Sequence, residues 1–185
     1  MKLIRRFTIK AAVVGAVAYL TLILWSATAL AQTPAPGARI FKADPRAETR
    51  TYHMDDANVD VPYCQFKSSK ISKNKPAPLV VSLHGFGAGP QIMCNTTAVD
   101  LAEQGGYILV APMGYSIAGW YGSPVIHLRA APGATAAPAE PRDHDIEKWS
   151  EEDVMTVLAM MRKEFNIDKH RIYLTGHSMG GGWRR

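Results

Sequence analysis

The strongest pattern in the chain is a set of short apolar runs separated by longer segments of mixed polarity. Leu79–Leu83 and Tyr107–Ala111 are uncharged runs; the first leads into the glycine-rich stretch His84–Gly89, and the second ends at Pro112. Runs of this length and composition suit strands that are buried on both faces of a parallel sheet. Arg171–Leu174 is a shorter run that leads into the glycine-rich stretch Thr175–Gly180. The pattern predicts three neighbouring strands of one sheet.

Helical periodicity lies between these runs. Pro90 can begin a helix that continues to about Gln104 and ends at Gly105-Gly106. A second helix is expected from Ser150, a suitable N-cap followed by three acidic residues. Its apolar face consists of Val154, Val157, Leu158, Met161 and Phe165. Strands that alternate with helices predict right-handed crossovers and a largely parallel sheet, so the expected fold class is α/β.

The remaining segments are predicted from turn residues and β-formers. Thr49–Met54 and Val61–Lys67 are expected to form an antiparallel hairpin at the start of the domain. Met113–Lys148 contains an Ala/Pro-rich part and is predicted to be a surface loop or flap. Asn166–His170 is expected to be a turn before the last strand.

The first 31 residues have the pattern of an export signal. Four basic residues precede the apolar stretch Ala11–Trp25, and Ala29-Leu30-Ala31 before Gln32 fits a cleavage site. The alternative is an uncleaved membrane anchor, because Ala11–Ala31 is long enough to span a bilayer. Either way, we expect an exported protein, periplasmic or secreted. Residues 32–47 are then a linker and residues 48–185 the folded domain.

The net charge of +5 comes mainly from this leader. Removing its four basic residues from the total of 21 leaves 17, against 16 acidic residues. A nearly neutral domain has no basic surface of the kind that binds nucleic acid. We therefore expect no nucleic-acid partner, and membrane contact only through an uncleaved leader.

Two cysteines, Cys64 and Cys94, lie in the domain. In an exported protein they can form a disulfide that links the predicted hairpin to the first helix. Two buried, unpaired thiols are the alternative, because the sequence gives no distance between the two Cα atoms.

The glycine-rich stretch after the last strand has the G-x-S-x-G spacing of a nucleophile elbow, with Ser178 at its centre. A strand enters, the chain turns sharply, and a helix leaves. Gly176 and Gly180 avoid side chains that would collide as strand and helix approach each other. The serine hydroxyl is then exposed, and the Met179 N–H can point at a developing oxyanion.

A second glycine-rich stretch, His84-Gly85-Phe86-Gly87, follows the first buried strand. Acyl transfer needs two backbone donors aimed at the oxygen that gains charge. Met179 N–H would supply one and Phe86 N–H the other. A plain glycine-rich turn is the alternative, and the later G-x-S-x-G motif favours the oxyanion role.

These ordered motifs resemble the α/β-hydrolase superfamily. The resemblance is carried by Leu79–Gly87, Tyr107–Tyr115 with Gly119–Gly122, and Asp168–Gly182, and it extends over residues 48–182. It is nearest to exported esterases of the polyhydroxybutyrate-depolymerase and feruloyl-esterase-like group. It implies hydrolysis of small or polymeric carboxylic esters by a Ser-His-Asp triad, with Ser178 as nucleophile and without a metal or other cofactor.

The sequence departs from this superfamily after the nucleophile. The triad Asp and His follow the serine in chain order, whereas the seven residues after Ser178 contain neither. Upstream histidines are poor substitutes. His127 and His144, the latter between Asp143 and Asp145, fall in the predicted loop. His177 is expected to pack locally, and His84 to orient its own loop.

The sequence therefore predicts the N-terminal portion of an α/β-hydrolase-fold serine esterase, incomplete at its C-terminus. Without a base, Ser178 is a weak nucleophile, and we expect these 185 residues to be inactive alone. The segment expected to follow would also cover one face and edge of the sheet. The alternative is an inactive fragment that acts as a binding or interaction module.

Overall fold

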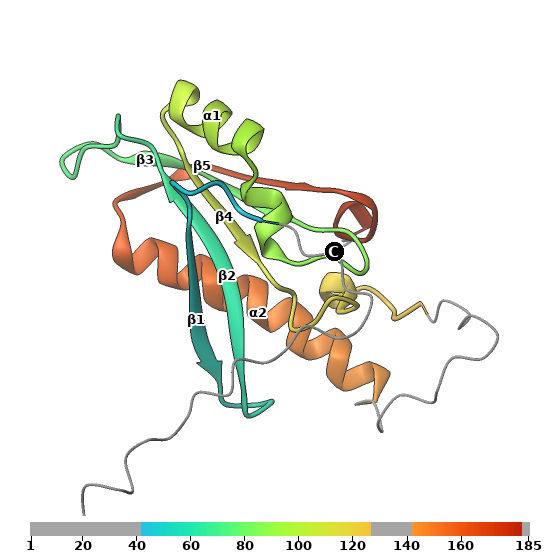
Figure 1. Ribbon diagram of the computed structural model, residues 1–185. Helices are drawn as coiled ribbons and strands as arrows, with labels where there is room; N and C mark the ends of the chain where they lie inside the picture. Colours follow the sequence, from blue (N-terminus) through green and yellow to red (C-terminus); the bar gives the residue numbers. More distant parts are fainter. Residues whose placement is uncertain (1–41, 127–141, 183–185) are drawn as a thin grey trace, which may run out of the picture. The chain divides into compact units, whose positions relative to one another are not determined.

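The domain is built on a five-stranded sheet flanked by helices (Figure 1). The computed structural model describes residues 42–126 and 142–182, which all lie within one compact unit. The predicted leader lies outside the described residues. The strands are β1 (Glu48–Met54), β2 (Val59–Lys67), β3 (Ala77–Leu83), β4 (Ile108–Pro112) and β5 (Ile167–Gly176). The helices are η1 (Pro90–Cys94), α1 (Thr96–Gly105), η2 (Trp120–Gly122), α2 (Asp143–Glu164) and η3 (Ser178–Gly182).

The strand order is β1-β2-β4-β3-β5, and the sheet is mixed. The predicted antiparallel hairpin is β1 with β2, and β2 then pairs antiparallel with β4. The central strand β3 is parallel to β4 on one side and to β5 on the other. The fold class predicted from the sequence is therefore confirmed, with the parallel part confined to β4, β3 and β5.

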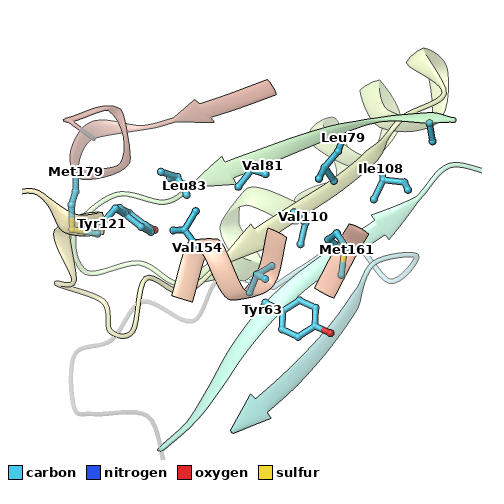
Figure 2. Close-up of a cluster of buried hydrophobic side chains, with 12 residues drawn as sticks. Tyr63, Leu79, Val81, Leu83, Ile108, Val110, Tyr121, Val154, Met161 and Met179 are labelled. Atoms are coloured by element: carbon cyan, nitrogen blue, oxygen red, sulfur yellow. The ribbon is translucent and has the colours of Figure 1, made fainter. Parts of the chain in front are cut away.

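Helices cover both faces of the sheet, and β4 shows how its side chains divide between them. Ile108 and Val110 pack with Val154, Val157 and Met161 of α2, in the cluster drawn in Figure 2. The alternate positions, Leu109 and Ala111, pack on the other face with Val99 and Ala102 of α1. Because successive side chains of a strand point to opposite faces, a strand between two helical layers must be apolar throughout.

The predicted first helix is divided into two helices. Pro90 begins the 3₁₀ helix η1, and Asn95 then caps α1 by accepting a hydrogen bond from Ala98 N–H at 3.0 Å. Gly106, at φ 67°, ends α1 close to the predicted position. The structure supports the disulfide alternative, because Cys64 of β2 is bonded to Cys94 of η1, with their Cα atoms 6.4 Å apart.

The predicted start of the second helix is wrong. α2 begins at Asp143, so that Asp143, His144 and Asp145 form its first turn. Ser150 is fully buried in the middle of the helix and caps nothing at its start. Its hydroxyl donates to the Glu147 carbonyl at 3.0 Å and accepts from Gly122 N–H at 3.0 Å. The serine thus bonds backbone groups, as serine commonly does, but not those of a helix N-terminus.

The last strand is longer than predicted. β5 begins at Ile167 instead of Arg171, and its register against β3 shifts between the Ala77–Ile167 and Leu79–Ile172 pairs. The predicted turn is thus an irregularity within the strand. Asp168 closes it by accepting hydrogen bonds from His170 N–H and Arg171 Nε, at 2.9 and 2.7 Å.

Two further features concern the ends of the described chain. The last residues of the predicted linker are fixed to the domain, because Asp44 is buried, donates its N–H to the Cys94 carbonyl at 2.8 Å and pairs with Arg46.

At the other end, β5 is hydrogen-bonded only to β3 among the described strands, and its Tyr173 and Leu174 are 54% and 44% exposed. Among residues 42–126 and 142–182, the helices are too short or too polar to cross a membrane.

Candidate active site

The predicted nucleophile elbow, residues 176–180 and called the elbow below, has a backbone geometry that only glycine allows at two positions. A Cβ on Gly176 would lie 2.3 Å from the Gly180 carbonyl oxygen. A Cβ on Gly180 would lie 2.5 Å from the carbonyl oxygen of Leu83 on the neighbouring strand. His177 N–H donates to that Leu83 carbonyl at 3.0 Å and holds the elbow to β3. The turn therefore closes only because both positions lack side chains.

Ser178 occupies the strained corner of this turn. Its φ is 52°, in the left-handed region that β-carbon-bearing residues rarely adopt. The residue is exposed, whereas Met179 beside it is buried. The helix that follows, η3, is a 3₁₀ helix in the described residues. A strained, exposed serine between two glycines is the arrangement that the sequence motif predicts.

The predicted oxyanion loop, residues 84–87 and called the oxyanion loop below, lies against the elbow. A Cβ on Gly85 would be 3.4 Å from the Ser178 Cβ and 3.2 Å from Cδ2 of His177. A larger residue at this position would narrow the gap between the two segments. Gly87, at φ 74°, turns the loop back and donates its N–H to the Ile117 carbonyl at 2.9 Å. The sheet topology explains this proximity, because β3 and β5 are parallel neighbours and end at the same edge.

The two predicted oxyanion donors are unengaged in the described part of the chain. Two neighbouring amides are used: Gly87 N–H donates to the Ile117 carbonyl, and Ala88 N–H donates to the Gly85 carbonyl at 3.1 Å. Neither Phe86 N–H nor Met179 N–H donates to an acceptor among the described residues. The Phe86 side chain is 44% exposed and packs beside Trp120, with ring centroids 6.3 Å apart.

His84 is fully buried at the base of the oxyanion loop. Its Nε2 lies 2.7 Å from the Met113 carbonyl oxygen, and its Nδ1 lies 2.9 Å from the carbonyl oxygen of Gly85. Burial lowers the pKa of the imidazole, although both carbonyls favour its protonated form. A neutral ring has one N–H to donate and both of its nitrogens face backbone, so His84 orients the loop, as predicted, and is not placed to act on a substrate.

The described part of the segment after β4 forms a wall beside the site. Tyr121, in η2, is fully buried, and its hydroxyl accepts a hydrogen bond from His84 N–H at 3.0 Å. On the elbow side, Ser123 Oγ donates to the Gly182 carbonyl at 3.2 Å. The segment 113–125, called the wall loop below, is therefore bonded to both halves of the candidate site.

The structure does not bring the remaining histidines into a triad. His144 is exposed in the first turn of α2, and His177 is exposed beside the serine. His127 lies outside the described residues. Among the described residues, no histidine nitrogen is hydrogen-bonded to the Ser178 hydroxyl. The same residues contain no cluster of His, Cys, Asp or Glu suited to a metal ion.

Sequence reasoning missed one residue of this region, Asp153. It was expected to contribute to the charged first turn of a helix, but it is fully buried in the middle of α2. Its carboxylate accepts from Gly114 N–H at 2.5 Å and from the Tyr52 hydroxyl at 2.6 Å. In the sequence, Asp153 lies next to Val154 and four residues before Val157. Helical periodicity therefore places it on the apolar side of the helix and could have indicated that it is buried.

Comparison with solved structures identifies the architecture. A CE1 ferulic acid esterase from Anaeromyces mucronatus superposes with a TM-score of 0.50 at 20% identity, over 72% of this chain and 49% of its own. An S-formylglutathione hydrolase from Agrobacterium tumefaciens gives 0.50 at 19% identity, over 74% and 50%. The chain has the α/β-hydrolase fold. A fluorophosphonate-binding serine hydrolase from Staphylococcus aureus gives 0.51 at 15% identity, over 73% and 48%.

Sequence comparison also finds an esterase. A bifunctional acetylxylan esterase/xylanase from Neocallimastix patriciarum is 30% identical over 117 residues, which are 63% of this chain and 14% of that protein. No protein-family model matches. The chain thus spans a small part of its curated relative and about half of the solved structures that it resembles. The resemblance to serine esterases predicted from the motifs is confirmed.

Proposed function

We propose that this domain carries the nucleophile and the oxyanion hole of a serine hydrolase that cleaves carboxylic esters. The observation that carries the proposal is the juxtaposition of the two loops. Ser178 lies at a strained, exposed corner, against Gly85 of a loop whose Phe86 N–H is unengaged. The esterases with the same fold support this reaction class.

In this mechanism, the Ser178 hydroxyl attacks the ester carbonyl carbon while a base removes its proton. The carbonyl oxygen gains negative charge and is stabilised by the N–H groups of Phe86 and Met179. Collapse of the tetrahedral intermediate expels the alcohol, which takes up the proton, and leaves an acyl group on Ser178. Water then attacks the acyl-enzyme by the same steps and releases the carboxylic acid.

The described residues place no base against the Ser178 hydroxyl. His84 is occupied by backbone carbonyls, and the other described histidines are not bonded to the serine. Oxyanion donors alone retain only a residual fraction of triad catalysis. We therefore propose that an Asp and a His outside the described residues complete the triad, and that residues 1–185 alone hydrolyse esters poorly.

The substrates that we propose are small or polymeric esters met outside the cytoplasm. The relatives are named for ferulic acid and acetylxylan esters, which fits this class. Export, to the periplasm or beyond the cell, is supported by the leader pattern and by the Cys64–Cys94 disulfide, since disulfides persist in oxidising compartments. Sequencing the N-terminus of the mature protein tests this, and a start at Gln32 is expected.

A fluorophosphonate probe tests the nucleophile directly. A protein that includes the proposed triad Asp and His is incubated with the probe and followed by gel fluorescence, together with hydrolysis of a p-nitrophenyl acyl ester. Labelling should disappear in Ser178→Ala and persist in Ser72→Ala, an exposed serine distant from the site in sequence. Labelling that survives in Ser178→Ala would rule out this residue as the nucleophile.

The alternative is a domain that binds an ester or another chain without cleaving it. It is favoured by the absence of a base bonded to Ser178 among the described residues. It predicts a folded protein that neither reacts with the probe nor turns over the ester, even when the complete gene product is supplied. Probe labelling of that product at Ser178 would exclude the alternative.

A further inference from the structure

One face of α2 carries three polar side chains that would be out of place in a purely apolar packing surface. Glu147, Ser150 and Asp153 are spaced i, i+3, i+6 and therefore lie along the same side of the helix. Each accepts a hydrogen bond from the backbone of the wall loop. The three bonds are Val125 N–H to Glu147 Oε1 at 3.1 Å, Gly122 N–H to Ser150 Oγ at 3.0 Å and Gly114 N–H to Asp153 Oδ2 at 2.5 Å.

The wall loop needs this support because its backbone is strained. Tyr115, Trp120 and Tyr121 have φ values of 66°, 56° and 51°, and none of them is glycine. Each such residue is disfavoured relative to an ordinary backbone conformation. Gly114, at φ 71°, allows the Tyr121 ring to pack closely, because a Cβ there would lie 2.4 Å from Cε1 of the ring. Such a loop keeps its shape only if its surroundings fix it.

The wall loop in turn fixes the oxyanion loop through three bonds. The Tyr121 hydroxyl accepts from His84 N–H at 3.0 Å, the Met113 carbonyl lies 2.7 Å from His84 Nε2, and the Ile117 carbonyl accepts from Gly87 N–H at 2.9 Å. These contacts flank Phe86, whose N–H is one of the two proposed oxyanion donors. Asp153 is thus connected to the oxyanion loop through Gly114 and its neighbour Met113.

We propose that Asp153 is a positioning residue of the active site, which acts through the wall loop to hold the oxyanion loop in place. The proposal rests on the function proposed above. A fully buried carboxylate is costly unless donors compensate, and here Gly114 N–H, Tyr115 N–H at 3.4 Å and the Tyr52 hydroxyl do so. An apolar side chain would fill the same space without fixing the loop backbone.

The consequence for catalysis is specific. An oxyanion donor contributes in the transition state, when the carbonyl oxygen gains charge, and contributes little to ground-state binding. Misplacing the Phe86 N–H should therefore lower kcat and leave KM nearly unchanged. Substitution of a residue that only stabilised the fold would change the amount of folded protein, without an effect on kcat per folded molecule.

Hydrogen exchange measured by mass spectrometry tests the positioning without requiring activity. In Asp153→Leu, amides of residues 84–87 and 113–122 should exchange about tenfold faster, as loss of roughly one buried hydrogen bond predicts. Amides of α1 should be unchanged. Asp153→Asn should restore nearly normal exchange, because its oxygen can accept from Gly114 while its NH₂ group donates to the Tyr52 hydroxyl. Asp145→Asn, in the first turn of the same helix, is the matched control.

Three outcomes decide the proposal. Faster exchange in both segments, with rescue by Asn, supports it. Faster exchange in residues 113–122 alone, or in neither segment, overturns it. If Asp153→Leu does not fold, Tyr121→Phe decides instead, because it removes only the acceptor for His84 N–H and should accelerate exchange at residues 84–87.

Fluorophosphonate labelling supplies the functional arm. The labelling rate of the complete gene product should fall about tenfold in Asp153→Leu and recover in Asp153→Asn. For a turned-over ester, the loss should appear in kcat. If the wild-type protein does not label at all, the proposed function fails, while the exchange experiment still tests whether Asp153 positions the loop.

Discussion

Strands β3 and β5 are parallel neighbours, and each ends in one half of the candidate site, yet they are supported in opposite ways. Leu79, Val81 and Leu83 of β3 are 0–3% exposed, whereas Tyr173 and Leu174 of β5 are 54% and 44% exposed. The oxyanion loop after β3 is held by polar bonds from the wall loop. The elbow after β5 is bonded to β3 through His177 N–H and has no room for a Cβ at Gly176 or Gly180. We therefore expect substitutions in the two halves to destabilise the domain by different mechanisms.

The largest effect is expected from the β3 side of this comparison. Leu79→Ala should reduce the free energy of unfolding by about 3 kcal/mol, because it leaves a cavity in the cluster between β3, β4 and α2. Leu101→Ala is the matched control, since that side chain is 53% exposed on α1. Urea denaturation followed by circular dichroism measures both. Equal losses for the two variants would contradict the burial described for β3.

A smaller loss, about 2 kcal/mol, is expected when the elbow is crowded. In Gly180→Ala the new methyl group would lie 2.5 Å from the Leu83 carbonyl oxygen, and backbone must move to admit it. Gly182→Ala is the control, because a Cβ there meets nothing within 4 Å. Only Gly180→Ala should show a lower Tm and slower probe labelling at Ser178. Normal labelling in Gly180→Ala would show that the elbow can relax.

These differences mark what the sequence could and could not predict. The runs that became β3 and β4 were recognisable because burial on both faces demands an uninterrupted apolar pattern. The elbow was recognisable because its glycine spacing is a steric requirement of the turn itself. Both features depend on residues close together in the chain.

The features that sequence reasoning misplaced depend on tertiary contacts. Ser150 looks like an N-cap because serine before acidic residues suits a helix start, but its hydroxyl bonds Gly122 across the fold. Asp153 looks like a first-turn acid for the same reason, and its partners Gly114 and Tyr52 are 39 and 101 residues away. No local pattern encodes such pairs. The exposure of β5 likewise depends on its neighbours in the sheet.

The burial of His84 after β3 also predicts that the stability of the domain depends on pH. Burial lowers the pKa of His84 below its ordinary 6.5, whereas a hydrogen bond to Asp60 raises the pKa of exposed His53. The neutral form of His84 is favoured in the fold, so this residue reduces the stability of the native state as pH falls below about 6.5. The effect of His53 is opposite, because its protonated form is favoured in the fold and that gain is lost as pH rises.

Nuclear magnetic resonance of the histidine rings should resolve this pair. The His84 midpoint is expected below 6.5 and the His53 midpoint above it, with His53→Gln assigning the second signal. A His84 midpoint above 6.5 would instead mean that the imidazolium donates to the Met113 and Gly85 carbonyls together. The oxyanion loop would then be held by a charged ring.

The smallest effect on stability is expected at the exposed surface of β5. Leu174→Thr keeps a residue that favours strands and should change the free energy of unfolding by less than about 0.5 kcal/mol. Val81→Thr is the matched control, since Val81 is the register partner of Leu174 on β3 and is 3% exposed. It buries a hydroxyl in the core and should cost about 1–3 kcal/mol.

The same Leu174→Thr variant should change association more than stability. An exposed strand edge with apolar side chains favours pairing between chains, so sedimentation at rising concentration should show less self-association in the variant. If Leu174→Thr destabilises the protein as much as Val81→Thr, then Leu174 is covered in solution. The difference in side-chain exposure between β3 and β5 would in that case be a property of the isolated domain and not of the functional protein.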